Sequence, residues 1–301
     1  MRAVSLLPAA TEIVAALGLM DELVGVSHEC DYPNEANVKP RITHCEIHES
    51  GLPSNQVDQW VTNNLNSVGT LYTLDEELLH RLAPDVILTQ KLCDVCAVDY
   101  GSVAKFACTL PGSPKVVNLE PSSLNDIFED IRKVAAALGT PERAELVIEG
   151  LEQRVKRVRD SVASAETRPS CYLMEWIDPQ FCSGHWGPEL VEIAGGYDPL
   201  GKKGENSKRI TWEDVLRVQP EIIVIACCGY SIERTLQDLP ILKQYPGWDA
   251  LPAVKQKQVF VVDGSAYFSR PGPRIVDSLE ILAAIIHPEL FKCEHPYWGV
   301  V

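Results

Sequence analysis

Short apolar runs alternate with stretches of helical periodicity along most of this chain. The apolar runs predict strands at residues 3–7, 23–27, 85–89, 115–119, 171–175, 221–226 and 258–263. The helical stretches predict helices at residues 11–17, 74–82, 188–194, 212–218 and 273–286. Strands and helices in alternation are typical of β–α units with parallel strands. The pattern therefore predicts an α/β fold built from two sets of such units.

A long helical pattern separates the two sets. Its apolar stripe consists of Val147, Leu151, Val155, Val158 and Val162, spaced as one face of a helix requires. Thr140 can cap the start of this helix, and Pro141 fits its first turn. A helix over residues 141–165 would be roughly 37 Å long at 1.5 Å per residue. We therefore expect two Rossmann-like lobes, residues 1–139 and 168–301, joined by a rigid connecting helix within residues 140–167.

An internal similarity relates the two sets. The segments "RLAPDVILT" (81–89) and "RVQPEIIVI" (217–225) share an arginine, a proline, an acidic residue and an apolar strand in the same order. The similarity indicates either two lobes of one design or a chance resemblance between two ordinary junctions. In parallel sheets, ligands bind beyond the carboxyl ends of the strands. We therefore expect the residues after these two strands to lie at equivalent, ligand-facing positions.

Four thiols follow the two similar strands: Cys93 and Cys96 after the first, Cys227 and Cys228 after the second. A C-x-x-C pair can hold zinc or an iron–sulfur cluster, form a redox couple, or consist of two free thiols. His28, Cys30, His44, Cys45 and His48 are further candidate ligands for a metal. The spacing alone leaves these alternatives open.

Aromatic and histidine side chains are frequent in the segments expected at the strand ends. The candidates for ligand binding are Tyr32, Tyr72, Trp176, His185, Trp186, Tyr230, Tyr267 and Phe268. Aromatic rings offer flat apolar contact surfaces, and tyrosine adds a polar tip. Core packing is the alternative role for each of them.

Composition restricts the function classes. The chain has 301 residues, a formal net charge of −15 and an isoelectric point near 4.9. A chain this acidic, without a basic cluster, is a poor candidate for binding nucleic acid or an anionic membrane. No apolar run reaches the length of a membrane span, and the first residues lack the pattern of a signal peptide. With ten cysteines in addition, we expect a cytoplasmic protein, or a periplasmic one if the given N-terminus is not the native one.

Several segments together resemble the class III, helical-backbone substrate-binding proteins of ABC importers, and in particular their cobalamin-binding branch. The segments are "VSLLPAATEIVAALGL" (4–19), "GVSHECDYP" (25–33), "LAPDVILTQ" (82–90), "GHWGPELVEIAGG" (184–196) and "AYFSRPGPRI" (266–275). The resemblance implies two α/β lobes that hold a ligand between them. Exported members dock on their permease through one surface glutamate on each lobe. Glu77 matches the first, whereas Ser269 stands where the second is expected, so we expect no productive docking.

No catalytic motif stands out in the sequence. A nucleophile elbow, a Walker A loop and a dinucleotide-binding glycine motif are all absent. We therefore expect a binding protein rather than an enzyme, with cobalamin or a related corrinoid as ligand. The alternative is a metal-cluster or thiol-dependent protein, possibly an enzyme, that uses Cys93, Cys96, Cys227 and Cys228 on the same scaffold.

Overall fold

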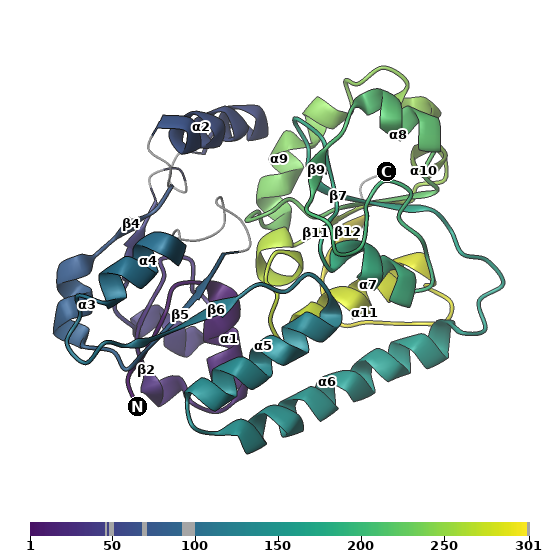
Figure 1. The fold of residues 1–301 in the computed structure, drawn as a ribbon. Coiled ribbons are helices and arrows are strands. Elements are labelled where there is room, and N and C mark those ends of the chain that lie inside the picture. The colour runs from purple at the N-terminus through teal and green to yellow at the C-terminus, as the bar shows by residue number, and fades with distance from the viewer. Residues whose placement is uncertain (46, 48–50, 68–70, 92–99, 300–301) are drawn as a thin grey trace. The chain divides into compact units, whose positions relative to one another are not determined.

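The computed structural model describes residues 1–45, 47, 51–67, 71–91 and 100–299 (Figure 1). The chain divides into two compact units. Unit 1 comprises residues 1–52, 59–121 and 125–150, and unit 2 comprises residues 53–58, 122–124 and 151–301. No described helix is long and apolar enough to cross a membrane.

Unit 1 contains a four-stranded parallel sheet in the order β2-β1-β5-β6. Its strands are β1 (Ala3–Ser5), β2 (Leu23–Val26), β5 (Val86–Gln90) and β6 (Lys115–Leu119), and β3 (Thr43–His44) pairs with β4 (Thr73–Leu74) outside it. The helices are α1 (Pro8–Ala16), α3 (Glu76–Leu82), α4 (Tyr100–Ala107) and α5 (Leu124–Ala137), with short 3₁₀ turns at Met20–Glu22 and Asn34–Val38. Helix α2 (Ser54–Ser67) begins in unit 2 and ends in unit 1.

Unit 2 contains a six-stranded mixed sheet in the order β12-β11-β10-β7-β8-β9. The strands are β7 (Cys171–Trp176), β8 (Phe181–Cys182), β9 (Lys208–Arg209), β10 (Ile222–Ile225), β11 (Val259–Val262) and β12 (Tyr297–Gly299), of which β7, β10 and β11 are mutually parallel. The helices are α7 (Gly187–Ile193), α8 (Trp212–Val218), α9 (Ile232–Leu242), α10 (Pro252–Lys255) and α11 (Ile275–Ile286), besides a 3₁₀ turn at Trp248–Ala250 and a π-helix at Gly264–Phe268. The three parallel strands are almost wholly apolar and buried, as a sheet covered on both faces requires.

The predicted connecting helix is one unbroken helix, α6 (Pro141–Val162), and appears as such in Figure 1. Its first part belongs to unit 1 and its second part to unit 2. In unit 1, Arg143 donates to the carbonyl oxygen of Leu17 (2.9 Å) at the end of α1, and Arg132 on α5 forms two hydrogen bonds with Glu145 (2.8 and 3.0 Å). Each part of α6 is therefore fixed to its own unit by arginine contacts as well as by its apolar stripe.

The internal repeat is confirmed at the level of the backbone. Helices α3 and α8 both begin with a side-chain cap, from Asp75 and Thr211 respectively. Both end at a residue in the left-handed conformation, Ala83 (φ 41°) and Gln219 (φ 48°), and a proline follows each. A left-handed residue ends a helix by turning the chain away from the helix axis.

The acidic residues of the repeat perform the same task in both units. The Asp85 carboxylate accepts a hydrogen bond from the backbone N–H of Arg2 (2.7 Å), directly before β1. The Glu221 carboxylate accepts one from the backbone N–H of Ser170 (2.8 Å), directly before β7. In each case the acidic residue's own N–H donates back to the same partner, at 2.7 and 3.1 Å. Each acid therefore aligns its strand with the neighbouring parallel strand, and the resemblance between the two segments reflects a shared design.

Candidate functional site

Aromatic side chains meet at the carboxyl ends of β7 and β10 in unit 2. Trp176 is the last residue of β7, and Tyr230 follows β10; their ring centroids lie 4.8 Å apart. The Trp176 indole N–H donates to the carbonyl oxygen of Ser54 (3.3 Å), which holds the ring in place. Both rings are half-buried, so each presents part of its surface to solvent. The strand ends thus carry an ordered and partly open aromatic pair, and its contact with a ligand stays a prediction.

An arginine completes this pair. The guanidinium of Arg234, on the first turn of α9, lies 4.3 Å from the centre of the Tyr230 ring and donates to the Tyr230 hydroxyl (3.2 Å). Asp238, one turn further along α9, lies 3.2 Å from the same guanidinium. Burial raises the pKa of Tyr230 to about 12, so its hydroxyl stays protonated at neutral pH. The sequence analysis missed Arg234, although its place four residues after Tyr230, behind the helix-capping Ser231, is visible in the sequence.

Beyond β11, the chain forms the π-helix Gly264–Phe268 rather than the loop that was expected. Asp263 caps it by accepting a hydrogen bond from the N–H of Ala266 (2.6 Å). The N–H of Ser265 donates to the carbonyl oxygen of Tyr230 (3.1 Å), so the segments after β10 and β11 are hydrogen-bonded to each other. Tyr267 is half-buried on this π-helix, which follows β11 in the same sheet.

Two predicted aromatic residues are largely buried. Trp186 is 8% exposed and donates its indole N–H to the carbonyl oxygen of Phe268 (3.1 Å), which is itself 7% exposed. The two side chains therefore join the segment before α7 to the π-helix. Their role in ligand contact stays a prediction, whereas their contribution to packing is evident.

His185 has an unusual backbone and side-chain setting. Its φ of 51° is rare for a residue with a side chain, and two backbone hydrogen bonds, to Glu205 (2.6 Å) and from Gly204 (2.9 Å), maintain it. Burial lowers the pKa of the imidazole, so the ring is neutral at pH 7. Its Nε2 atom is enclosed and has no hydrogen-bond partner among the described residues. An enclosed Nε2 cannot reach a ligand without a local rearrangement, so contact through another edge of the ring stays a prediction.

Glu175 organises the lysine-containing segment 201–208. Its carboxylate accepts hydrogen bonds from the N–H of Gly184 (3.1 Å) and from the hydroxyl of Ser207. Gly184 is required here, because a Cβ at this position would lie 2.2 Å from the backbone nitrogen of Ser207. The partly buried Glu175, next to Trp176 in the sequence, therefore holds the segments of Gly184 and Ser207 together.

The two candidate residues of unit 1 differ in exposure. Tyr32 is 46% exposed, whereas Tyr72 is 8% exposed and belongs to the apolar core. The Tyr72 ring lies 5.5 Å from that of His28, whose Nδ1 is 2.7 Å from the hydroxyl of Thr43. Tyr72 thus packs in the core, whereas nearly half of the Tyr32 surface is exposed.

The thiols are not arranged as a metal site in the part of the chain that the structure describes. Cys227 is fully buried in the core of unit 2, and burial raises the pKa of its thiol. Cys228 is exposed, although the two are adjacent. Cys93 and Cys96 lie outside the described residues, so their predicted convergence with Cys227 and Cys228 stays a prediction.

The other metal candidates of unit 1 are engaged in ordinary contacts. Cys30 lies 3.1 Å from the hydroxyl of Thr11 and 3.2 Å from that of Ser27, and Cys45 is buried in the core. His44 is exposed, and His48 lies outside the described residues. Among the described residues, one group brings three potential ligand atoms together: Asp277, Glu280 and His295 in unit 2.

Two surface depressions lie elsewhere. One of about 450 Å³ in unit 2 is lined by Arg159, Arg168, Glu189 and Lys203, among others, and one of about 310 Å³ in unit 1 lies along β3 and β4. Neither is lined by a predicted aromatic or histidine residue of the ligand site, although the depression in unit 1 includes the candidate metal ligand His44. The candidate site therefore rests on the strand-end aromatic residues of unit 2.

Comparison with known proteins gives consistent matches over nearly the whole chain. A family model described as "Periplasmic binding protein" matches residues 4–266. The vitamin B12-binding protein of Vibrio cholerae is 24% identical over 283 residues, 93% of this chain and 86% of that protein. An uncharacterized ABC transporter substrate-binding lipoprotein of Bacillus subtilis is 22% identical over 96% of this chain and 81% of its own length. The crystal structure of a periplasmic heme-binding protein from Pseudomonas aeruginosa has a similar fold, with a TM-score of 0.74, 21% identity and coverage of 98% of this chain and 95% of that one.

Proposed function

The chain belongs to the periplasmic binding protein family, and on that premise we propose that it is a solute-binding protein whose ligand is a corrinoid. The observation that carries the proposal is the ordered pair of Trp176 and Tyr230 at the carboxyl ends of two parallel strands. This edge of a parallel sheet is where ligands of α/β proteins bind. The family consists of binding proteins, so no reaction is assigned to the site.

The charge balance around the pair supports a corrinoid over a porphyrin. Heme bears two carboxylates, whereas a corrin is fringed by neutral amides. Arg234 is balanced by Asp238 at 3.2 Å. Arg270 and Arg274 both lie close enough to Asp263 to oppose the rise that burial causes in its pKa. A site in which each arginine already faces a carboxylate suits neutral polar groups better than it suits anionic ones.

The relatives support either tetrapyrrole class, and a titration distinguishes them. One relative is named as binding vitamin B12, and one structure of similar fold is named as binding heme. We expect calorimetric heat and a spectral shift with cyanocobalamin, and much weaker binding of hemin. If hemin binds and cyanocobalamin does not, the proposed ligand becomes a porphyrin instead of a corrinoid. If neither binds, the proposal is refuted.

The residue that carries the proposal can be tested directly. Trp176→Ala should weaken cyanocobalamin binding about thirtyfold, because loss of a central aromatic contact costs about 2 kcal/mol. Tyr197→Ala is the matched control, since Tyr197 is a 47% exposed aromatic residue of unit 2 that is remote from the strand ends in sequence and forms no part of the pair. Equal affinities of the Trp176→Ala variant and the unaltered protein for cyanocobalamin would show that Trp176 does not contribute to ligand binding.

The thiol-dependent alternative receives no support from the described residues. A thiol must lose its proton to bind zinc or iron, and burial holds the Cys227 thiol in its protonated form. Metal analysis of the purified protein tests the point. Stoichiometric zinc or iron that disappears in Cys93→Ser and Cys96→Ser variants would restore the alternative.

We further propose that the chain docks on a permease through Glu77 and Glu213. The repeat pairs α3 with α8, and it matches Glu77 with Glu213, two residues after the caps Asp75 and Thr211. Both glutamates are exposed, and neither forms an ion pair with another described residue. Ser269, where the second glutamate was expected, follows the π-helix and has no counterpart in α3. The reason for expecting no docking is thereby removed.

Docking and ligand binding are separable by experiment. The double variant Glu77→Ala/Glu213→Ala should lose binding to a permease reconstituted in lipid discs while its affinity for cyanocobalamin stays unchanged. Ser269→Ala is the control for both measurements. The expected cytoplasmic location is likewise a prediction, and fractionation of the native cells tests it: recovery of the protein in the periplasm or on the cell surface would contradict it.

A further inference from the structure

The segment after α11 returns to the sheet of unit 2. Residues 293–299, here called the C-terminal strap, end in β12, which pairs antiparallel with β11 and forms one edge of the sheet. The ring of Tyr297 lies edge-on to that of Phe260, with centroids 6.0 Å apart. Apart from these contacts, β12 is exposed along its whole length. A short, exposed edge strand is an element of low local stability, so its other anchor matters.

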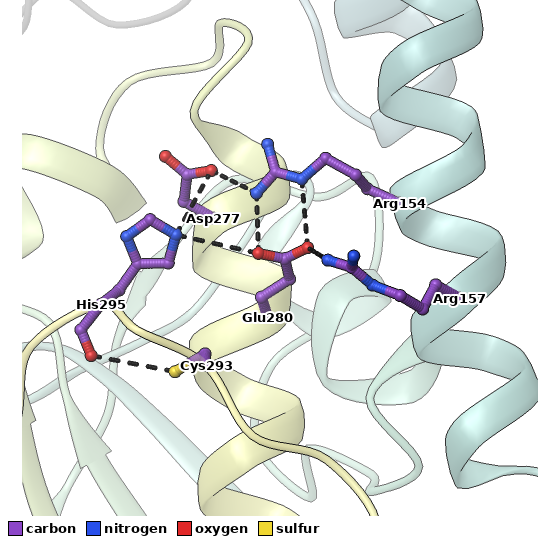
Figure 2. A network of polar contacts seen from close by, with 6 residues as sticks. All are labelled: Arg154, Arg157, Asp277, Glu280, Cys293 and His295. Atoms are coloured by element: carbon purple, nitrogen blue, oxygen red, sulfur yellow. Dashed lines mark hydrogen bonds and ion pairs between the residues drawn. The ribbon is translucent and has the colours of Figure 1, made fainter.

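That anchor is His295, and Figure 2 shows its surroundings. Its Nε2 lies 3.6 Å from a carboxylate oxygen of Asp277 and 3.7 Å from one of Glu280, both on α11. The Asp277 and Glu280 side chains are only 11% and 7% exposed. The same two carboxylates accept hydrogen bonds from Arg154 on α6, at 2.5 and 2.7 Å, and Glu280 also accepts one from Arg157 at 2.6 Å. One buried pair of acids therefore holds the connecting helix on one side and the C-terminal strap on the other.

The cluster does not suit a metal ion, although its three potential ligand atoms converge. The Arg154 guanidinium already lies between the two carboxylates, where a cation would have to sit. Burial lowers the pKa of Arg154, but its hydrogen bonds to Glu280 and Asp277 outweigh this effect and raise it. Two arginines thus neutralise two acids, and the cluster has a structural rather than a cation-binding character.

His295 also contacts a candidate ligand residue. Its ring packs edge-on against Tyr267, with centroids 5.4 Å apart, and the Arg274 guanidinium lies 5.5 Å from the centre of the same tyrosine ring. We propose that His295 is a positioning residue that fixes the C-terminal strap against Tyr267, so that strap closure and ligand binding favour each other. The identity of the ligand rests on the proposed function. The closure of the strap rests on the contacts of His295 alone.

Cys293 offers a reporter of strap closure. It lies within the strap, is half-buried, and its thiol contacts the carbonyl oxygen of His295 at 3.8 Å. Burial raises its pKa, which slows its reaction with thiol reagents while the strap is closed. The rate of alkylation at Cys293, followed by mass spectrometry of its peptide, therefore measures opening of the strap. Peptide-level detection separates this signal from the exposed Cys108 and Cys228.

Two variants of His295 separate the contribution of its polar contacts to strap closure from the contribution of its ring. His295→Phe keeps a ring against Tyr267 but removes the polar anchor, and it should accelerate alkylation of Cys293 about tenfold, equivalent to about 1.4 kcal/mol. His295→Gln keeps a donor toward the carboxylates and should give a smaller acceleration than His295→Phe. Glu294→Gln is the matched control, because Glu294 is adjacent and exposed and takes no part in the contacts of Figure 2. Equal rates for His295→Phe and the control would overturn the role of His295.

A second experiment tests whether binding of cyanocobalamin and closure of the C-terminal strap are thermodynamically coupled. If closure and binding favour each other, saturating ligand should slow alkylation of Cys293, and cyanocobalamin should bind more weakly to His295→Phe than to the unaltered protein, since coupling is reciprocal. Binding of cyanocobalamin with an unchanged alkylation rate would overturn the coupling while leaving the proposed function intact. Absence of binding would refute the proposed function, and the comparison of His295→Phe with Glu294→Gln would still decide the role of His295.

Discussion

Glu280 provides the sharpest test of how the second half of α6 is held. Glu280→Gln removes the charge that receives Arg154 and Arg157 while preserving the shape of the side chain. A hydrogen bond to a charged group contributes about 1.5–3 kcal/mol, but Arg154 and Arg157 are 31% and 62% exposed, so solvent reduces both contributions. We therefore expect a loss of about 2–3 kcal/mol in the free energy of unfolding of unit 2, equivalent to a fall of roughly 4–12 °C in its melting temperature.

The assay and the pH dependence follow from the same contacts. Five of the six tryptophans, all except Trp60, belong to unit 2, so tryptophan fluorescence during urea unfolding reports mainly on that unit. Burial raises the pKa of Glu280, but its bonds to Arg154 and Arg157 outweigh this effect and lower it below the ordinary value of 4.5. An acid whose pKa is lower in the folded than in the unfolded protein stabilises the folded state above its ordinary pKa. This stabilisation is lost as the pH falls through the lowered pKa.

The difference in the free energy of unfolding between Glu280→Gln and the unaltered protein should therefore be constant from pH 6 to 8 and shrink below pH 4.5. Asp160→Asn is the control, since Asp160 pairs with Lys156 on an exposed part of α6 that also belongs to unit 2, and it should change the stability of that unit little. A destabilisation no larger than that of the control, or one that does not depend on pH, would refute the reasoning.

Three further outcomes follow from single positions. Burial raises the pKa of Asp130 to about 6 from 3.8, so the folded state holds this proton more tightly than the unfolded state. The free energy of unfolding should therefore rise by up to about 3 kcal/mol as the pH falls from 7 to 4. Asp130→Asn should abolish that gain in urea titrations. Ala83→Gly and Gln219→Gly should each raise the melting temperature, because glycine adopts their left-handed conformation without strain; a lowered melting temperature for either would contradict this. In the native protein, Cys228 should react quickly with Ellman's reagent and Cys227 only after unfolding, as peptide mass spectrometry can show.

The fold was largely predictable because its signals are local. Most of the parallel strands contain a short apolar run, such as Ile222–Ile225 and Val259–Val262, and α6 was recognised from its stripe, although it ends three residues earlier than predicted. The elements that were missed lack such signals. Helix α2 is mostly polar, and α9 contains an internal proline that argues against a helix. The strand β12 depends on pairing with β11 across a long separation in sequence, which no local pattern reveals.

The site was less predictable, because position along a strand does not fix which side chains remain accessible. The candidates Trp176, Tyr230 and Tyr267 are half-buried at strand ends, as expected, whereas Tyr72 and Phe268 lie in or next to the core. The sequence places all five equally well, since a residue after a strand can turn inward or outward. What separates them is tertiary contact: Ser54 holds the ring of Trp176, and the π-helix carries Tyr267 and Phe268.

Cys227 and Cys228 show the physical limit of motif reasoning most clearly. They are neighbours in sequence and follow a strand that ends at a ligand-facing edge, so both were candidate metal ligands. The Cys227 side chain is fully buried in the core of unit 2, and the carbonyl group of Cys227 lies so close to Gly264 that an added Cβ there would be 2.0 Å from its oxygen. That close approach joins β10 to the start of the π-helix and places Tyr230 and Ser265 in hydrogen-bonding contact. Gly264 thus lets the two strand-end segments come together, and this contact brings the segments of Tyr230 and Tyr267 next to each other.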